Sequence, residues 1–295
     1  SIYGQEYTNT TFKLAKMNLA IRGIAANLGE MAANTFSNDQ HKDLKADFIM
    51  ANPPFNLKKW YEGPQCDNSI WADYDTPPEG NANYAWILHM LSKLKKGKGV
   101  AGFLLANGAL GDEDAIEIRK KLIENDKIEA IVVLPRELFY TTDISVTLWI
   151  LNENKQGGMW HGRNLRNREN EILFMDLRQW IDNPVKNEQK KKVELSAEQI
   201  NRAAKIYFDW QTEGTDGTHY EEPELYRSVR FDELKESNFS LVPSRYIEFI
   251  DRDTNIDYNK VLADTATTVS DLLRRQRQND ETLRNALKQL GYECK

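Results

Sequence analysis

The chain has 295 residues, of which 40% are hydrophobic, and this is enough for a sizeable core in one large domain or two. No apolar run approaches the roughly 20 residues that a membrane span needs, and the first residues do not resemble a signal peptide. We therefore expect a soluble, cytoplasmic protein. The net charge of -6 has the wrong sign for a protein that grips the DNA backbone unaided, so a role on DNA would need another component to hold the duplex.

Neither a metal site nor a disulfide is expected from the sequence. Cys66 and Cys294 lie far apart and form no metal-binding or redox spacing, so we interpret both as reduced, structural thiols. The four histidines are scattered along the chain, and they do not have the spacing of metal ligands.

Residues 2–6 are typical of the end of a strand, with Glu6 at its tip. An acidic residue at the end of a strand in a nucleotide-binding fold commonly hydrogen-bonds ribose hydroxyls, so Glu6 is a candidate cofactor ligand. An ordinary surface carboxylate is the alternative. The apolar spacing that follows predicts a well-buried helix capped by Asn9 or Thr10. Residues 29–36 then predict a short strand or turn with Asn34 near its end.

The most informative stretch is Asn52-Pro53-Pro54-Phe55, which follows an apolar run at residues 48–51. That run is short and β-permissive, and it predicts a buried strand of a parallel sheet that ends at the prolines. Ligands of open α/β sheets collect at such carboxyl ends. Two consecutive prolines remove two N–H donors and hold the chain extended. The Asn52 side-chain oxygen and the Pro53 carbonyl can therefore present acceptors without competing donors.

Two fixed hydrogen-bond acceptors of this kind can bind the two hydrogens of an amino group. The exocyclic amine of adenine is a poor nucleophile because its lone pair is delocalised into the ring. Acceptors on its two hydrogens would stabilise the positive charge that develops as the nitrogen attacks a methyl group. Phe55 would stack on the base, and this stacking returns roughly 1–3 kcal/mol against the few kcal/mol needed to pull a base from a duplex. The alternative is an ordinary loop with Phe55 in the core.

The segment from Leu57 to Asn81 is rich in Pro, Asp, Gly and Trp and has no periodicity, which predicts a long loop. Its aromatic residues either line a nucleic-acid groove or pack the loop onto the domain. They are Trp60, Tyr61, Trp71 and Tyr74.

Beyond this loop, helical and strand patterns alternate. Apolar periodicity predicts helices over residues 84–94 and after residue 112. Buried strands are predicted at 100–106, 128–134, 144–151 and 172–175. Such alternation implies an α/β fold with a parallel sheet and right-handed crossovers. Too few residues separate the strands at 128–134 and 144–151 for a crossover helix, so that last pair should be antiparallel.

The C-terminal region is expected to be mainly helical. Ser196 and Gln199 form a capping box that opens a helix. From Leu262 to Leu290 apolar residues recur at seven-residue intervals, with a second set four residues further on, and polar residues interrupt this seam in its middle. The heptad pattern predicts a long helix that packs on another helix, and a helix of a partner subunit is favoured over one of the same chain.

Several motifs occur in a characteristic order along the chain. They are Gly4-Gln5-Glu6, Met17-Asn18-Leu19, Asn52-Pro53-Pro54-Phe55, Ile87-Leu88-His89-Met90-Leu91, Leu134-Pro135 with Leu138-Phe139-Tyr140-Thr141, and Leu241 to Tyr246. In this order they closely resemble the modification subunit of type I restriction-modification systems, which are N6-adenine DNA methyltransferases that use S-adenosylmethionine. Several spaced motifs in one order are far more specific than any one of them.

The resemblance implies a Rossmann-like methyltransferase sheet and a role for each residue of the tetrapeptide. Asn52 and Pro53, stiffened by Pro54, would hold the amino group of the target adenine, and Phe55 would stack on the flipped base. A second aromatic wall would come from Tyr140 or Phe139, with a core position as the alternative for Phe139.

The resemblance also implies S-adenosylmethionine as the cofactor, with Glu6 at its ribose. Where the family usually has an acidic residue at the cofactor adenine, the nearest match is Asn34, whose amide oxygen can accept a hydrogen bond without the charge assistance of a carboxylate. The family's glycine-rich cofactor loop and its first central strand precede the Gly-Gln-Glu strand, where this sequence begins. We therefore expect a C-terminal piece of a longer subunit, truncated on the N-terminal side of the sheet and poor at binding the cofactor alone.

We predict an N-terminally incomplete catalytic domain at residues 1–180 and a helical region for subunit docking at residues 181–295. The resemblance implies DNA as the substrate, held mainly through a separate specificity subunit, with a restriction subunit and a second modification subunit as further partners. Two alternatives stay open. One is a protein methyltransferase directed at the N5 nitrogen of glutamine, where the fourth motif residue is usually Tyr. The other is a non-catalytic assembly module.

Overall fold

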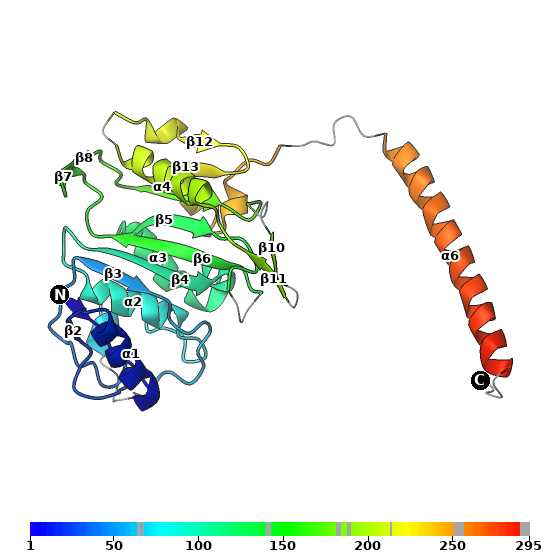
Figure 1. The fold of residues 1–295 in the computed structure, drawn as a ribbon. Coiled ribbons are helices and arrows are strands. Elements are labelled where there is room, and N and C mark those ends of the chain that lie inside the picture. The colour runs from blue at the N-terminus through cyan, green and yellow to red at the C-terminus, as the bar shows by residue number, and fades with distance from the viewer. Residues whose placement is uncertain are drawn as a thin grey trace. The chain divides into compact units, whose positions relative to one another are not determined.

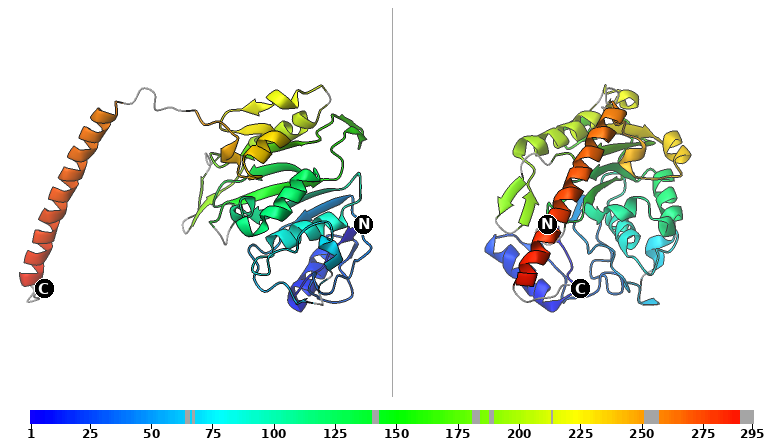
Figure 2. Two further views of the ribbon diagram at one scale, coloured as in Figure 1. Left: turned by 180° about the vertical axis from the view of Figure 1, so that it is seen from behind. Right: turned by 90° about the vertical axis from the view of Figure 1, so that its right-hand side faces the viewer.

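The computed structural model of the chain describes residues 1–63, 66, 68–139, 143–180, 184–187, 190–212, 214–250 and 257–289. The chain forms two compact units, Ser1–Glu248 and Phe249–Lys295. The first unit is a mixed sheet with helices against both of its faces (Figures 1 and 2). The second unit contains one long helix, α6 (Tyr258–Gln289).

The first unit alternates helices and strands over most of its length. Its helices are α1 (Asn9–Ile21), α2 (Asn83–Lys93), α3 (Ile116–Glu124), α4 (Ala197–Gln211) and α5 (Phe231–Glu236). Its strands are β1 (Ile2–Tyr3), β2 (Ala26–Asn27), β3 (Phe48–Ala51), β4 (Val100–Ala106), β5 (Ile128–Val133), β6 (Val146–Asn152), β7 (Gly158–Trp160), β8 (Arg163–Leu165), β9 (Glu171–Asp176), β10 (Pro184–Asn187), β11 (Lys190–Val193), β12 (Glu221–Glu222) and β13 (Tyr226–Arg230).

Seven strands form the central sheet in the order β12-β13-β9-β5-β6-β4-β3. β3 pairs in parallel with β4, whereas β6 lies between β4 and β5 and runs antiparallel to both. The predicted α/β class and the predicted antiparallel pair are therefore confirmed. Because β6 alone is reversed among these four strands, the carboxyl ends of β3, β4 and β5 lie at one edge of the sheet, beside the start of β6.

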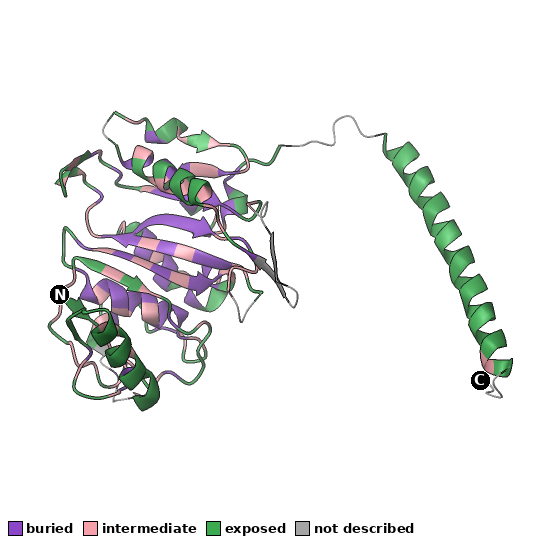
Figure 3. Ribbon diagram, viewed as in Figure 1, coloured by how far each residue is buried: buried purple, intermediate pink, exposed green. Residues whose placement is uncertain are grey.

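Both faces of the sheet are covered at β5, whereas the expectation of a buried strand at residues 48–51 was wrong, because the residues of the edge strand β3 alternate between exposed and half-buried. All six residues of β5 are buried, and their side chains alternate between two hydrophobic clusters because successive residues of a strand point to opposite faces. Ile131 packs in a cluster with Leu88 of α2 and Leu122 of α3. Val132 packs on the other face with Ile206 of α4. Figure 3 shows the resulting burial along β5 and β6.

Helix α1 is less buried than its sequence predicts. The cap is Thr8, one residue before the two predicted caps, and its side chain accepts a hydrogen bond from the N–H of Thr11. Phe12 is the only buried residue of the helix, whereas Met17 and Ile21 are 55% and 75% exposed. The expectation of a well-buried helix was therefore wrong. Apolar spacing shows which residues share a face, but it does not show whether another segment covers that face.

The first compact unit extends beyond the predicted catalytic domain. β13 lies after residue 180 and continues the central sheet by pairing antiparallel with β9. The boundary between the two compact units falls between residues 248 and 249. This pairing joins segments that are distant in sequence, so local patterns did not indicate it. The division into a catalytic region and a docking region stays a prediction about function.

Two helices predicted in the C-terminal part are present in the structure. At the start of α4, Ser196 Oγ accepts a hydrogen bond from the N–H of Gln199 at 3.1 Å, and the N–H of Ser196 donates to Gln199 Oε1 at 2.9 Å. The long helix is α6, and none of its residues is buried; Leu290 of the heptad pattern lies outside the described residues. No helix in the described part of the chain is long and apolar enough to cross a membrane.

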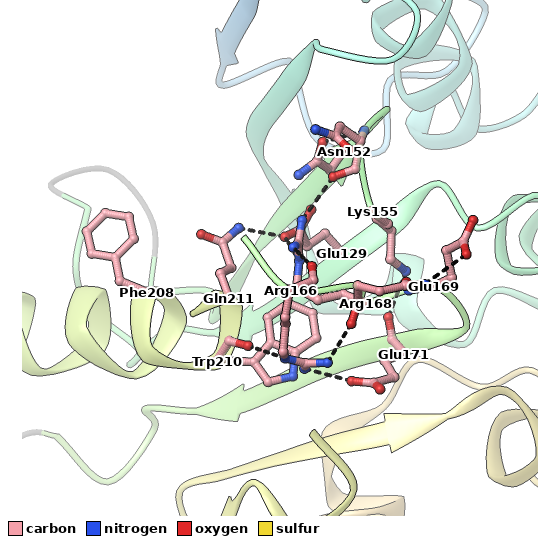
Figure 4. Close-up of polar contacts among 12 residues, drawn as sticks. Glu129, Asn152, Lys155, Arg166, Arg168, Glu169, Glu171, Phe208, Trp210 and Gln211 are labelled. Atoms are coloured by element: carbon pink, nitrogen blue, oxygen red, sulfur yellow. Dashed lines mark hydrogen bonds and ion pairs between the residues drawn. The ribbon is translucent and has the colours of Figure 1, made fainter. Parts of the chain in front are cut away.

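A buried ionic network lies at the amino ends of β5 and β9 (Figure 4). Arg168 Nε lies 3.1 Å from Glu129 Oε1, and both side chains are fully buried. Gln211, at the end of α4, donates a hydrogen bond to the same oxygen at 2.6 Å. Nearby, Lys155 pairs with Asp126. Burial lowers the pKa of Lys155 and raises the pKa of Asp126. These contacts fasten the loops around β8 to the sheet and to α4.

Breaking this network from one side should destabilise the protein strongly. Arg168→Met leaves the Glu129 carboxylate buried without its cation, so the free energy of unfolding should fall by roughly 3–5 kcal/mol in urea denaturation. Arg202→Met is the matched control, because Arg202 pairs with Glu222 at the surface, where the side chains are 53% and 45% exposed. That change should cost at most about 1 kcal/mol. Equal losses in the two variants would contradict the prediction.

Candidate active site

The loop after β3 carries the residues predicted to bind the target base. Asn52 follows the last residue of β3. Asn52 and Pro54 are exposed, Pro53 is buried and Phe55 is half-buried. Among the described residues, the Asn52 side chain has no hydrogen-bond partner and the Phe55 ring has no ring partner. The amide and the ring are therefore available to a ligand.

The far end of this loop is held by asparagine side chains. The N–H of Asn56 donates to Asn83 Oδ1 at 3.0 Å, and Asn83 Nδ2 donates to Asn56 Oδ1 at 2.9 Å. Asn83 is the first residue of α2 and is 1% exposed. The N–H of Ala82 also donates to the carbonyl of Leu57 at 3.0 Å. The loop is thus fixed to the sheet at one end and to α2 at the other.

Further polar groups lie at the neighbouring strand ends. Thr147, at the start of β6, donates a hydrogen bond at 2.7 Å to Oδ1 of Asn107, which follows β4. Ser145 donates to the carbonyl of Leu134, which follows β5, at 2.8 Å. These contacts belong to the same edge of the sheet as Asn52, and they fix the chain where it leaves β4 and β5.

The predicted second aromatic wall stays a prediction. Phe139 is half-buried, and Tyr140 lies outside the described residues. A cavity of about 840 Å³ is lined by Lys93, Lys127 and Glu153 together with other residues. It lies at the opposite end of the strands, so the candidate base site is not part of this cavity.

The loop after β2 folds back over the end of β1, which pairs with β2 in parallel. Gln5 Nε2 donates to the carbonyls of Ala33 and Asn38 at 3.2 and 2.9 Å, and the N–H of Ala33 donates to the carbonyl of Glu6 at 2.9 Å. These bonds bring together Glu6 and Asn34, the two predicted cofactor ligands. Glu6 is half-buried, and its carboxylate has no hydrogen-bond partner in the described part of the chain.

Asn34 uses both ends of its amide. Its Oδ1 accepts a hydrogen bond from the N–H of Phe36 at 2.9 Å, and its Nδ2 donates to Glu62 Oε1 at 3.2 Å. One lone pair of the amide oxygen is therefore left for a ligand. The hydrogen bond from Nδ2 places the Glu62 carboxylate beside Asn34. The sequence did not indicate this contact, because 28 residues separate the partners.

Aromatic packing joins this cofactor side to the loop that follows Phe55. The Phe36 ring lies 4.9 Å from the ring of Trp60 and 4.3 Å from that of Trp86. Trp60 and Trp71 are 2% and 3% exposed. For these two tryptophans the packing alternative is confirmed, and they do not line a nucleic-acid groove. The two halves of the candidate site are thus parts of one packed structure.

His89 of α2 is half-buried beside the same rings. Its ring lies 6.1 Å from that of Phe36 and 6.4 Å from that of Trp86, and its Nδ1 is buried without a hydrogen-bond partner among the described residues. Burial lowers the pKa of His89 to about 4, with Asp39 opposing the shift and Lys93 adding to it. His89 is therefore neutral at physiological pH.

Comparison with known protein families decides where this fold belongs. A family profile described as N-6 DNA Methylase matches residues 1–255, most of the chain. The chain belongs to the N-6 DNA methylase family. This confirms the family that the order of motifs predicted, and the matched residues include every element of the central sheet.

Two individual proteins are similar to this chain along nearly its whole length. The chain is 37% identical to the HindI type I restriction enzyme methylase subunit of Haemophilus influenzae, over 99% of this chain and 62% of that subunit. It is 30% identical to the MjaIX methylase subunit of Methanocaldococcus jannaschii, over 98% of this chain and 49% of that subunit. The chain therefore spans 62% and 49% of the lengths of these two relatives.

A solved structure shows the same fold. The methyltransferase subunit of a type I restriction-modification system from Streptococcus thermophilus matches with a TM-score of 0.68 at 23% identity. The match covers 83% of this chain and 48% of that one. At this identity the likeness supports the arrangement of the sheet and helices, and it carries no assignment of individual residues.

The contacts between Asn56 and Asn83 at the candidate site were not predicted from the sequence. The one local signal was the polar run Asn81-Ala82-Asn83 before the apolar stripe of α2, which is typical of a helix start. That signal does not reveal which distant loop the asparagines bind.

The lowered pKa of His89 predicts a loss of stability in mild acid. Its pKa is about 4 in the folded protein and about 6.5 in an unfolded chain, so the unfolded state binds the extra proton between these two values. The contribution of neutral His89 is therefore complete above pH about 6.5 and is lost as the pH falls toward 4, by on the order of 3 kcal/mol. Urea unfolding measured over this pH range gives the loss.

His89→Phe supplies the control for this measurement. It keeps an aromatic ring among the same neighbours and removes the titrating nitrogens, one of which has no partner to lose. Its free energy of unfolding should depend less on pH over the same range. An unchanged pH dependence in this variant would assign the acid sensitivity to other groups.

Proposed function

We propose that this chain is part of the modification subunit of a type I restriction-modification system, which methylates adenine at N6 at specific sites in DNA with S-adenosylmethionine as the methyl donor. Its relatives are named as methylase subunits of type I restriction enzymes. The observation that carries the proposal concerns the loop at the carboxyl end of β3, which holds a half-buried Phe55 ring and an exposed Asn52 amide that has no hydrogen-bond partner among the described residues.

In this proposal the chain stabilises the charge that develops on the amine. Asn52 Oδ1 and the Pro53 carbonyl accept hydrogen bonds from the two hydrogens of the adenine amino group, which favours the positive charge formed as nitrogen attacks. Pro54 offers no N–H that would compete for these oxygens. Phe55 stacks on the flipped base and offsets part of the cost of unstacking it. Phe139 or Tyr140 is the proposed second wall.

The residues on the cofactor side fit S-adenosylmethionine. The unpartnered Glu6 carboxylate suits the two hydroxyls of a ribose. Asn34 keeps one lone pair for the amine of the cofactor adenine, and the carboxylate of Glu62 lies beside it. When bound, the cofactor supplies an electrophilic methyl group. The contribution of this chain is to hold the ribose and the adenine at the end of β1.

The proposal includes protein partners. The net charge of -6 favours a separate specificity subunit that holds the duplex. The resemblance to type I systems adds a restriction subunit and a second modification subunit to the proposed complex. Helix α6 has 32 residues and none is buried, so its heptad pattern suits docking on a helix of a partner.

These features also separate the proposal from its alternatives. The exposed α6 favours an assembly role in addition to catalysis, and Phe55 in the fourth motif position weighs against a glutamine-directed protein methyltransferase.

Asn52→Ala tests the proposal in the full-length protein purified with its specificity subunit. Removing one of two charge-stabilising acceptors should lower the rate of methyl transfer to DNA roughly 100- to 1,000-fold, measured as label transferred from the cofactor. Asn201→Ala, an exposed asparagine on α4, is the control and should keep the wild-type rate. Equal rates in wild type and Asn52→Ala would end the assignment. Label found in protein instead of DNA would favour the glutamine-directed alternative.

A further inference from the structure

A pair of asparagines, the exposed Asn56 and the buried Asn83, joins the candidate catalytic loop to helix α2. Asn56 comes immediately after Phe55 and exchanges two hydrogen bonds with Asn83, one from the Asn56 N–H at 3.0 Å and one from Asn83 Nδ2 at 2.9 Å. Asn83 is 1% exposed, so its amide is removed from water and depends on these bonds. The buried Asn83 side chain therefore uses its hydrogen bonds to hold the loop beside the candidate site.

Capping of α2 does not explain the Asn83 side chain. The residue before it, Ala82, has no side chain that could cap. Asn81 caps the helix instead, because its Oδ1 accepts a hydrogen bond from the N–H of Asn83 at 3.0 Å. The Asn83 amide is therefore free to point away from its own helix and bind Asn56. Its hydrogen bonds serve the loop and not the start of the helix.

The backbone of Asn56 is also specialised. Its φ is +52°, in the left-handed region, which Asn adopts more readily than other residues that carry a side chain. This turn redirects the chain directly after Phe55. The Asn56 side chain then closes the exchange of hydrogen bonds with Asn83, so the same residue supplies both the turn and its anchor.

The segment between the sheet and Asn56 has little freedom. Ala51 is paired with Phe103 in the sheet, and two prolines with fixed φ follow Asn52. Anchoring Asn56 fixes the other end. The four residues between these anchors include both proposed acceptors and the stacking ring, so their directions are set before any base arrives. Preorganised groups of this kind stabilise a transition state without a cost of rearrangement.

We propose that Asn83 and Asn56 are positioning residues, which hold the acceptors of Asn52 and Pro53 and the Phe55 ring in the geometry that captures an adenine. This inference rests on the proposed function of the same loop. Neither asparagine needs to touch the base, since each acts through the loop that it anchors.

Two variants break the exchange in different ways. Asn83→Ala removes the buried amide, and Asn56→Gly removes the other side chain while leaving the positive φ easily accessible. Both should lower kcat for methyl transfer roughly 10- to 100-fold, the size expected when reacting groups are misplaced by about 1 Å. The KM for DNA should change less than threefold, because the specificity subunit holds the duplex. The measurements use the full-length protein with its specificity subunit.

A conservative variant separates positioning from general stability. Asn56→Asp keeps an oxygen that accepts the hydrogen bond from Asn83 Nδ2 and a residue type that tolerates positive φ. Its kcat should stay within about threefold of wild type. Asn152→Ala is the matched control at the other end of the sheet, where a 5% exposed asparagine accepts a hydrogen bond from the N–H of Asn154 at 2.8 Å. It should lower the melting temperature but leave kcat unchanged.

The outcomes distinguish this inference from the proposed function. Loss of activity in Asn52→Ala with wild-type kcat in folded Asn83→Ala and Asn56→Gly would overturn the positioning role alone. A parallel loss of kcat in Asn152→Ala, or no rescue in Asn56→Asp, would also overturn it, because the effect would then follow stability. Wild-type activity in Asn52→Ala would overturn the proposed function and this inference together. Selective loss of kcat with rescue by Asn56→Asp supports the inference.

Discussion

The position of Asn52 depends on the parallel pairing of β3 with β4. Four residue pairs, from Phe48 opposite Val100 to Ala51 opposite Phe103, hold β3 at the edge of the sheet, and β4 in turn pairs along its whole length with β6. A shift of one residue in the β3 register would turn every side chain of the strand to the other face. The pairing therefore decides which way the motif leaves the sheet. Because β6 is reversed, its start lies beside the carboxyl ends of its neighbours β4 and β5.

The two ends of the sheet use polar groups differently. At the amino ends of β5 and β9, Arg168 and Glu129 neutralise each other, and each binds further protein groups. A buried pair of this kind is costly to break, so it locks the scaffold. At the carboxyl edge, Asn52 is exposed and has no partner among the described residues. Ligand binding requires polar groups on a rigid scaffold that do not already hydrogen-bond within the protein, because those groups still have donors or acceptors for a ligand.

Sequence reasoning succeeded where the cause of a structure is local. The strand predicted at 100–106 is β4 with the same ends, and the capping box of Ser196 and Gln199 forms as predicted, because an apolar run and a capping box are both patterns of residues close in the chain. The contact between Asn56 and Asn83 spans 27 residues and left no periodic trace. β13 joined the sheet for the same kind of reason, through pairing with a distant strand. The tetrapeptide at residues 52–55 was recognisable because prolines restrict the chain wherever they occur.

Exposed apolar side chains on α6 are also groups that would gain by contact with another segment. Leu262 and Leu273 of α6 are 66% and 50% exposed, and burying a side chain of this size gains roughly 1.5–3 kcal/mol. Helices owe most of their stability to packing of an apolar face, so 32 residues without a buried one form a helix that gains by docking. The heptad spacing matches such a seam to a second helix. The apolar seam of α6 therefore calls for a second helix to pack on, and the proposed complex would supply candidates for it.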